Sequence, residues 1–170
     1  MIRNFKIVKV DHKYCDYLRQ FDSKVSYNAG NKELRPFIGV LFVVEGCEYF
    51  APLSSPKVKH MHMKNNLDVV KIDGGRYGVV NFNNMIPVTS NNYELFDLNS
   101  TPKDTYELKW QNLLKSQLLW LNKNMKNVKG KAINLYEKYK NGKLDERIKS
   151  RCCNFILLEE KCKEYNKCKS

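Results

Sequence analysis

The chain changes its hydrophobic pattern near residue 100. In residues 1–100, apolar runs are short, rich in β-branched and aromatic side chains, and separated by turn residues, which is typical of strands joined by tight turns. In residues 101–170, apolar side chains recur at helical spacing over longer segments. The apolar faces of these helices need a sheet to cover them. The sequence therefore predicts one α+β domain over residues 1–170, with a compact, mostly antiparallel β-sheet core and surrounding helices.

The strand predictions centre on a nearly continuous apolar run at residues 37–44, which is expected to form a central strand. Glu45-Gly46 then turns the chain into a second strand at 49–51. Further strands are predicted at residues 5–8, 68–72, 77–82, 85–88 and 93–98.

Helix-start signals occur in both parts of the chain. Asp11 is expected to cap one short early helix. Thr101-Pro102 predicts the start of a long helix, with a capping hydroxyl and proline at the first helical position, and Tyr106 and Trp110 belong to its apolar face. Two more helices are predicted, one around residues 132–136 that ends near residue 142, and one around 155–165.

The chain is strongly basic. It carries 30 Lys and Arg against 18 Asp and Glu, a net charge of +12, and 17 of the basic residues lie in residues 101–170. Such a surface attracts polyanions, either nucleic acid or an anionic membrane. No apolar run approaches the ~18 residues that span a bilayer, and residues 1–6 lack the apolar stretch of a secretion signal. We therefore expect a cytoplasmic protein with a nucleic-acid partner and no membrane partner.

The six cysteines show no C-x-x-C pair and no neighbouring histidine cluster, so the sequence does not favour a zinc site. In a reducing compartment they are expected to be free thiols. We predict that Cys15, Cys47 and Cys162 are buried and pack as small apolar side chains.

Residues 51–60 combine hydroxyls, cationic side chains and an imidazole directly after a predicted strand. Such a group can bind a phosphate, transfer a proton and neutralise developing charge. We assign Ser55 to a hydrogen bond with a phosphate oxygen and Lys57 to charge neutralisation or proton transfer. His60 titrates in the useful range. The alternative is a solvated basic loop in which serine and proline serve as turn residues.

His60 and His62 also raise the question of a metal site. In an extended segment both imidazoles would face the same side. No Asp, Glu or Cys stands close enough in the sequence to complete such a site, so neither a metal nor another cofactor is expected. His62 is assigned instead to solvent or to contact with RNA.

Aromatic and basic side chains are interleaved between Lys13 and Arg35. This pattern suits single-stranded RNA, which proteins recognise by stacking and by contacts with base edges. For Tyr14 and Tyr27, core packing and base stacking both fit the pattern. Arg35 is either a surface charge or a phosphate clamp, and the lysines at 123–143 are either a solvated helix face or a face that contacts RNA.

Several segments carry a resemblance to a known family, and together they run nearly from end to end. They are Lys13-Tyr14, Tyr17-Leu18, FDSKV (21–25), RPFIG (35–39), YFAPLSSPK (49–57), Lys59-His60, YGVVNFNNMIP (77–87), CNF (153–155) and LLEEK (157–161). In order and spacing they resemble the endoribonuclease toxins of type III toxin–antitoxin systems, the ToxN/AbiQ/CptN family, in which the antitoxin is RNA.

The resemblance implies a strongly twisted sheet similar to the Kid/MazF-like toxin fold. It implies sequence-selective, metal-independent RNA cleavage that leaves a 2′,3′-cyclic phosphate and a 5′-hydroxyl. The implied partner is a pseudoknot antitoxin RNA, cut by the toxin from a repetitive precursor and bound in a cyclic protein–RNA hetero-oligomer. Cellular and phage RNAs are the implied substrates.

The resemblance also assigns site residues by position. Ser55 matches an essential hydroxyl, Lys57 the lysine two residues later, and Tyr14 a tyrosine near the active site. Ser54 stands where some relatives have threonine, and Arg35 stands where a lysine can occur, so Arg35 keeps the role of phosphate clamp. His60 is expected to be a supporting group of the catalytic site. The expected RNA-binding residues are Arg35, Tyr27 as the candidate loop tyrosine, Lys59, His62, Lys13 and Lys64.

Two other classes of function remain open from the residues alone. A non-catalytic RNA-binding regulator would keep the basic tail and the aromatics without needing Ser55 and Lys57. A toxin that acts on a protein such as gyrase would have no particular need for a net charge of +12.

Overall fold

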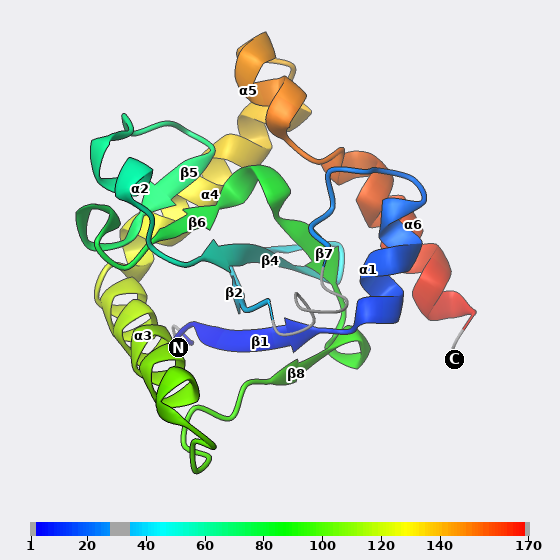
Figure 1. Cartoon of the computed structure of the whole chain (residues 1–170). Coiled ribbons are helices and arrows are strands. Elements are labelled where there is room, and N and C mark those ends of the chain that lie inside the picture. Colours follow the sequence, from blue (N-terminus) through cyan, green and yellow to red (C-terminus); the bar gives the residue numbers. More distant parts are fainter. Residues whose placement is uncertain (1–2, 28–34, 169–170) are drawn as a thin grey trace.

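The computed structural model describes residues 3–27 and 35–168 (Figure 1). Within these residues, eight strands form one antiparallel sheet with the order β5-β6-β4-β2-β1-β8, and β3 and β7 pair with β4 off this path. The strands are β1 (Lys6–Val10), β2 (Phe37–Gly39), β3 (Val43–Val44), β4 (Cys47–Ser54), β5 (Val69–Lys71), β6 (Val79–Asn81), β7 (Ile86–Val88) and β8 (Tyr93–Leu95). The α-helices are α1 (His12–Arg19), α2 (Val58–His62), α3 (Thr105–Lys123), α4 (Met125–Lys140), α5 (Glu146–Arg151) and α6 (Phe155–Lys167). The predicted α+β class is confirmed.

Strand β4 is the hub of the sheet, because it pairs with four other strands. Its first half pairs with β3 and β7, and its second half pairs with β2 and β6. The side chains of β4 from Tyr49 to Leu53 are buried on both faces. Ser54, the last residue of β4, is paired with Val79 of β6. The end of β4 is thus held in a fixed place by its neighbours.

The predicted central strand at residues 37–44 is split into two strands. Its first part, β2, pairs with β1 and with the second half of β4, whereas its last part, β3, pairs with the first half of β4. A tight contact occurs at Gly39, where an added Cβ would lie 2.5 Å from the ring of Phe50. A continuous apolar run therefore packs closely around β4 instead of running straight through the sheet.

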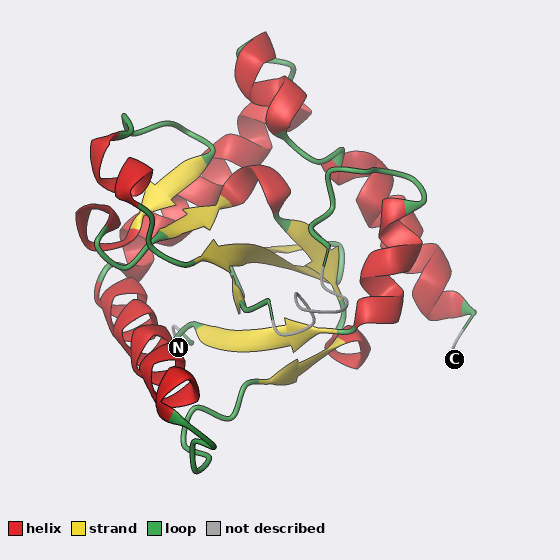
Figure 2. Cartoon of the chain, in the orientation of Figure 1, coloured by secondary structure: helices red, strands yellow, loops and turns green. Residues whose placement is uncertain are grey.

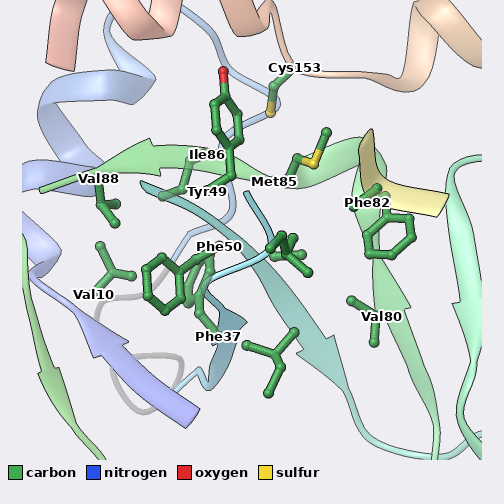
Figure 3. Close-up of a cluster of buried hydrophobic side chains, with 14 of the residues drawn as sticks. Val10, Phe37, Tyr49, Phe50, Val80, Phe82, Met85, Ile86, Val88 and Cys153 are labelled. Atoms are coloured by element: carbon green, nitrogen blue, oxygen red, sulfur yellow. The ribbon is translucent and has the colours of Figure 1, made fainter. Parts of the chain in front are cut away.

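Helices flank the sheet on several sides (Figure 2). Helix α3 contacts β1 and the 3₁₀ turn at Ile72–Gly75, while α6 packs on β7 and α1. The core between them is built from side chains of many elements, as the cluster around Phe37, Phe50 and Phe82 shows (Figure 3). Cys15, Cys47 and Cys162 are buried thiols of the core, as predicted.

The sequence predicted the correct number of long helices, but several details of the helix predictions were wrong. Asp11 caps α1 as expected, with its carboxylate accepting a hydrogen bond from the backbone N–H of Lys13. The long helix α3 begins at Thr105 and is capped by Asp104, not by Thr101. Helices α2 and α5 were not predicted, since they are short and α5 has no buried residue to give an apolar period. No helix among the described residues has the length and apolar character needed to cross a membrane.

A half-buried carboxylate joins β4, α4 and α6. The hydroxyls of Tyr49 and Tyr136 both donate hydrogen bonds to Oε1 of Glu159, at 2.5 and 2.6 Å. Burial, followed by the hydrogen bond to Glu159, raises the pKa of both phenols above the ordinary value. Both tyrosines therefore stay protonated and act as donors, and the two helices are tied to the hub strand.

Replacing Glu159 with alanine should lower the free energy of unfolding by about 2–4 kcal/mol, because two buried hydroxyls lose their short hydrogen bonds and Tyr49 keeps only a 3.5 Å contact with the carbonyl of Phe155. The matched change Glu160→Ala, at an exposed neighbour, should alter it by less than about 0.5 kcal/mol. Urea denaturation measures both variants. Equal effects of the two changes would contradict a structural role for the carboxylate.

Candidate functional site

A cleft of about 570 Å³ opens at the end of β4. One wall comes from the start of β2, the end of β4 and the residues after it, and the other wall comes from the first turns of α3 and the residues before it. The first wall is formed by Arg35, Pro36, Leu53, Ser54, Ser55 and Lys57, and the second by Lys103, Asp104, Tyr106, Glu107 and Trp110. The cleft thus brings together four residues that the sequence analysis assigned to phosphate binding or catalysis, Arg35, Ser54, Ser55 and Lys57.

The two serines are held differently. Ser54 is still part of the sheet, and its Oγ accepts a hydrogen bond of 2.7 Å from the side-chain amide of Asn81 on β6. Ser55 lies just beyond the strand and is exposed in the cleft. The anchored serine therefore fixes the position of the exposed one.

Gly78 also determines where the serines lie, although sequence reasoning missed it. An added Cβ at Gly78 would lie 1.9 Å from the carbonyl oxygen of Ser54 and 3.0 Å from the carbonyl carbon of Ser55. Its φ of +89° is in the region that favours glycine. The signal in the sequence was a glycine inside a predicted strand, which often marks close approach of another backbone segment.

Lys57 begins the short helix α2, and His60 holds that start in place. The backbone N–H of Lys57 donates a hydrogen bond of 3.1 Å to Nδ1 of His60. His60 is only 3% exposed, and burial together with the positive charges of Lys59 and Lys57 lowers its pKa. The imidazole is therefore neutral and accepts through Nδ1. His60 does not line the cleft, and its contact with the N–H of Lys57 places it behind the cleft wall; its role as a supporting group stays a prediction.

Arg35 reaches the cleft from the start of β2. The next residue, Pro36, accepts a backbone hydrogen bond of 2.9 Å from Leu53, which ties Arg35 to the end of β4. Burial lowers the pKa of the Arg35 guanidinium from its ordinary value, but an arginine remains charged at physiological pH. The cleft thus contains a fixed, half-buried positive charge.

Tyr14 lies in the core and not in the cleft. It is fully buried on α1, its hydroxyl donates a 2.5 Å hydrogen bond to the carbonyl of Pro87, and its ring packs 5.0 Å from that of Tyr165. Burial raises the pKa of the phenol well above its usual value. Of the two interpretations given for Tyr14, its buried position favours core packing over base stacking, and it ties α1 to β7; its assignment near the active site stays a prediction.

The remaining predicted RNA-binding residues lie outside the cleft lining. Tyr27 is 48% exposed and stacks with the guanidinium of Arg19, 4.5 Å from the ring centre. The side chains on or just after α2, together with one on α1, are exposed. These are Lys59, His62, Lys64 and Lys13.

The two histidines of the H-x-H pattern do not face the same side. Residues 58–62 form a helix and not an extended segment, so His60 is buried while His62 is exposed. Across residues 3–27 and 35–168, no three His, Cys, Asp or Glu side chains gather in a group that could hold a metal ion.

The second wall of the cleft was not recognised in the sequence as part of a site. The Asp104 carboxylate accepts a 2.7 Å hydrogen bond from the backbone N–H of Glu107, and the Glu107 carboxylate accepts a 2.6 Å bond from that of Lys103. Both acids are thus engaged in starting α3. Tyr106 was predicted on the apolar face of the helix but is 79% exposed. No local signal links this wall to Ser55, since the two lie about fifty residues apart in the sequence.

A second basic surface lies at the junction of α3 and α4. It is a hollow of about 670 Å³ lined by Lys123, Asn124, Lys126, Asn127, Gly130, Lys131 and Asn134. Three of the tail lysines considered for RNA contact therefore come together here. Lys129 instead lies over the ring of Phe5 at 5.4 Å.

The contact of Gly78 with Ser54 can be separated from the strain of a positive φ. Gly46 has a similar φ of +84° but open space where a Cβ would lie. Gly46→Ala should lower stability by about 1–3 kcal/mol from backbone strain alone. Gly78→Ala should lower it by a further ~1–3 kcal/mol, because a backbone carbonyl blocks the methyl group. Thermal and urea unfolding of both variants test this; equal losses would show that the close contact is unimportant.

His60 should make stability fall in mild acid. Because its folded-state pKa is lowered, the unfolded chain binds the proton first, and stability decreases as the pH falls below about 6.5. His60→Asn keeps a side-chain acceptor for the Lys57 N–H but cannot titrate, so its free energy of unfolding should depend less on pH between about 7 and 5. The control is His62→Asn, at an exposed position of the same helix. If His60→Asn keeps the full wild-type slope, His60 is not the titrating group.

Comparison with known proteins confirms the resemblance. Residues 6–163 match the family model of toxin ToxN of the type III toxin–antitoxin system. The endoribonuclease ToxN of Bacillus thuringiensis subsp. kurstaki is 36% identical over 166 residues, covering 95% of this chain and 84% of that protein. A chain solved in work on selective toxin inhibition by a non-coding RNA pseudoknot has a TM-score of 0.81 at 35% identity, with 96% of this chain and 99% of that chain covered. AbiQ, a lactococcal anti-phage endoribonuclease of a type III system, has a TM-score of 0.81 at 26% identity over 97% of this chain and 99% of its own. The chain therefore belongs to the ToxN toxin family of type III toxin–antitoxin systems.

Proposed function

We propose that this protein is a sequence-selective endoribonuclease that cleaves RNA without a metal ion and is held inactive by an antitoxin RNA. The endoribonuclease class follows from its family, whose curated members are named as such. The observation that carries the mechanism is the convergence of Arg35, Ser55 and Lys57 on one cleft. A hydroxyl and two cations on one wall fit a phosphodiester, which needs both hydrogen-bond donors and positive charge.

The proposed reaction is attack of the ribose 2′-OH on the neighbouring phosphorus, with departure of the 5′-oxygen. Charge builds up on the phosphate oxygens in the transition state, where fixed donors are most effective. Ser55 Oγ donates a hydrogen bond to a non-bridging oxygen, and Arg35 holds the phosphate through its guanidinium. Lys57 neutralises charge and gives a proton to the leaving oxygen, while the proton of the attacking 2′-OH passes to solvent water, from which the lysine ammonium is afterwards restored. The products are a 2′,3′-cyclic phosphate and a 5′-hydroxyl.

Ser54 and His60 act indirectly in this proposal. Ser54 is bound by Asn81 and so fixes the start of the Ser55–Lys57 segment. His60 fixes its end through the N–H of Lys57. Both ends of the reactive segment are therefore anchored, which reduces the freedom lost when RNA binds.

The proposed partner is a pseudoknot antitoxin RNA, which the toxin also cuts from a repetitive precursor. The related toxin studied with its RNA pseudoknot supports this choice. The net charge of +12 and the hollow at the α3–α4 junction add support. That hollow and the cleft lie toward opposite ends of α3, a helix of 19 residues and thus about 28 Å long. One protein could then touch two RNA molecules, as a cyclic assembly requires.

The proposed substrates are cellular and phage RNAs, and the proposed location is the cytoplasm, where both occur. The anti-phage activity named for AbiQ supports phage RNA as a target. Stacking and phosphate contacts in an open cleft favour single-stranded RNA over a duplex.

Purified protein should cleave single-stranded RNA in the presence of EDTA, and Ser55→Ala should slow cleavage about 10²–10³-fold, the loss typical of one transition-state donor. The control Ser90→Ala removes an exposed hydroxyl outside the cleft and should leave the rate unchanged. Mass spectrometry of the fragments should identify a cyclic phosphate end.

Strict dependence on a divalent ion, or full activity of Ser55→Ala, would contradict this mechanism. RNA binding that weakens steeply with salt but yields no fragments would favour the non-catalytic regulator instead.

A further inference from the structure

Tyr106 is a large aromatic side chain that stands exposed in a functional cleft. It lies in the first turn of α3, is 79% exposed, and lines the wall opposite Ser55 and Lys57. The family assignment and the proposed cleavage give this side chain no role. Tyr106 shares the cleft with cations that can bind a phosphate. Contact with a nucleic acid therefore explains its exposed position better than packing against the rest of the protein does.

The backbone of Tyr106 is held in place although its side chain is exposed. The reciprocal hydrogen bonds of Asp104 and Glu107 fix the first turn of α3. One helical turn further on, Trp110 is half-buried and packs edge-on against Phe96, with ring centres 5.4 Å apart. Residues four apart lie on the same helix face, so Trp110 supports the side of the helix from which Tyr106 projects.

The wall that carries Tyr106 is also coupled to the serine wall. The side-chain amide of Gln117, buried on α3, donates a 2.8 Å hydrogen bond to the carbonyl of Tyr77. The next residue, Gly78, is in close contact with Ser54 and Ser55. These contacts set the distance between α3 and the reactive segment. A site that binds both the phosphate and the base of one nucleotide requires such a fixed distance.

We propose that Tyr106 is a stacking platform for the base of a nucleotide adjacent to the cleaved bond, and so a determinant of sequence preference. This inference rests on the proposed function, because it assumes that RNA enters the cleft. With its phosphate held by Arg35, Ser55 and Lys57, a nucleotide directs its base toward the opposite wall. Stacking strength then discriminates among bases, and the larger ring system of a purine makes it the preferred base at that position.

Binding measurements test the platform separately from catalysis. In a Ser55→Ala background, in which cleavage is expected to be about 10²–10³-fold slower, fluorescence anisotropy follows a 5′-fluorescein-labelled single-stranded oligoadenylate of about ten nucleotides, within the usual range of site sizes. Tyr106→Ala should weaken binding about 5–150-fold, the range that corresponds to one stacked base. Tyr106→Phe should retain the parent affinity. Leu119→Ala, at a 68% exposed position of the same helix outside the cleft, is the matched control and should bind as the parent does.

Oligonucleotides with a single abasic position identify the stacked base. At one position, removing the base should weaken binding of the oligonucleotide to the parent protein. For that same abasic oligonucleotide, Tyr106→Ala should cause no further loss of affinity. At other positions the effects of the two changes should combine. A Tyr106→Ala protein that binds as tightly as its parent, or whose defect is equal at every abasic position, overturns the platform.

Cleavage assays on proteins that keep Ser55 separate this inference from the proposed function. RNA binding that depends on Tyr106 without any cleavage by the Ser55 protein overturns the proposed function alone. Cleavage with a KM unaffected by Tyr106→Ala overturns the platform alone. Failure of the parent to bind any of these oligonucleotides overturns the platform, and failure of the Ser55 protein to cleave any single-stranded RNA overturns the proposed function.

Discussion

The structure depends on the pairing of β4 with neighbours on both of its edges. Four strands hold β4 along its length, and its final residue is still paired when the chain leaves the sheet. The backbone of Gly78 then lies so close to Ser54 that no side chain fits between them. The reactive segment therefore starts from the best-anchored strand of the sheet. This anchoring allows an exposed serine and an exposed lysine to keep a defined position.

The charged side chains on the two walls of the cleft differ in their partners. Among the residues that the structure describes, no acid forms an ion pair with the cations of the first wall, Arg35 and Lys57. The two acids of the second wall accept hydrogen bonds from backbone N–H groups at the start of α3. Neither carboxylate therefore needs a cation from the opposite wall. The cleft lining carries three cations, Arg35, Lys57 and Lys103, against two acids, Asp104 and Glu107, so its net charge is positive and attracts a phosphate.

Local patterns in the sequence predicted much of the fold and the centre of the site. Ser54, Ser55 and Lys57 were recognisable because their side chains follow a predicted strand within a few residues, and Asp11 was recognisable as a helix cap. The burial of Tyr14 and His60 was not evident from the sequence, because nothing in the local sequence distinguishes a buried polar side chain from one at a reaction centre. The second wall was missed because only the tertiary fold brings α3 beside the end of β4. Residues 37–44 were predicted as one strand because an apolar run does not reveal where the chain changes partners.

The account's central claim is that the end of β4 holds a phosphodiester between Ser55 and Lys57. A crystal structure of the protein with an uncleavable single-stranded RNA, carrying 2′-deoxy sugars at each candidate position, tests it most directly. The account predicts a backbone phosphate within hydrogen-bonding distance of Ser55 Oγ, with the ammonium of Lys57 and the guanidinium of Arg35 beside it. An RNA that crosses the protein elsewhere, with no phosphate at Ser55, would contradict it.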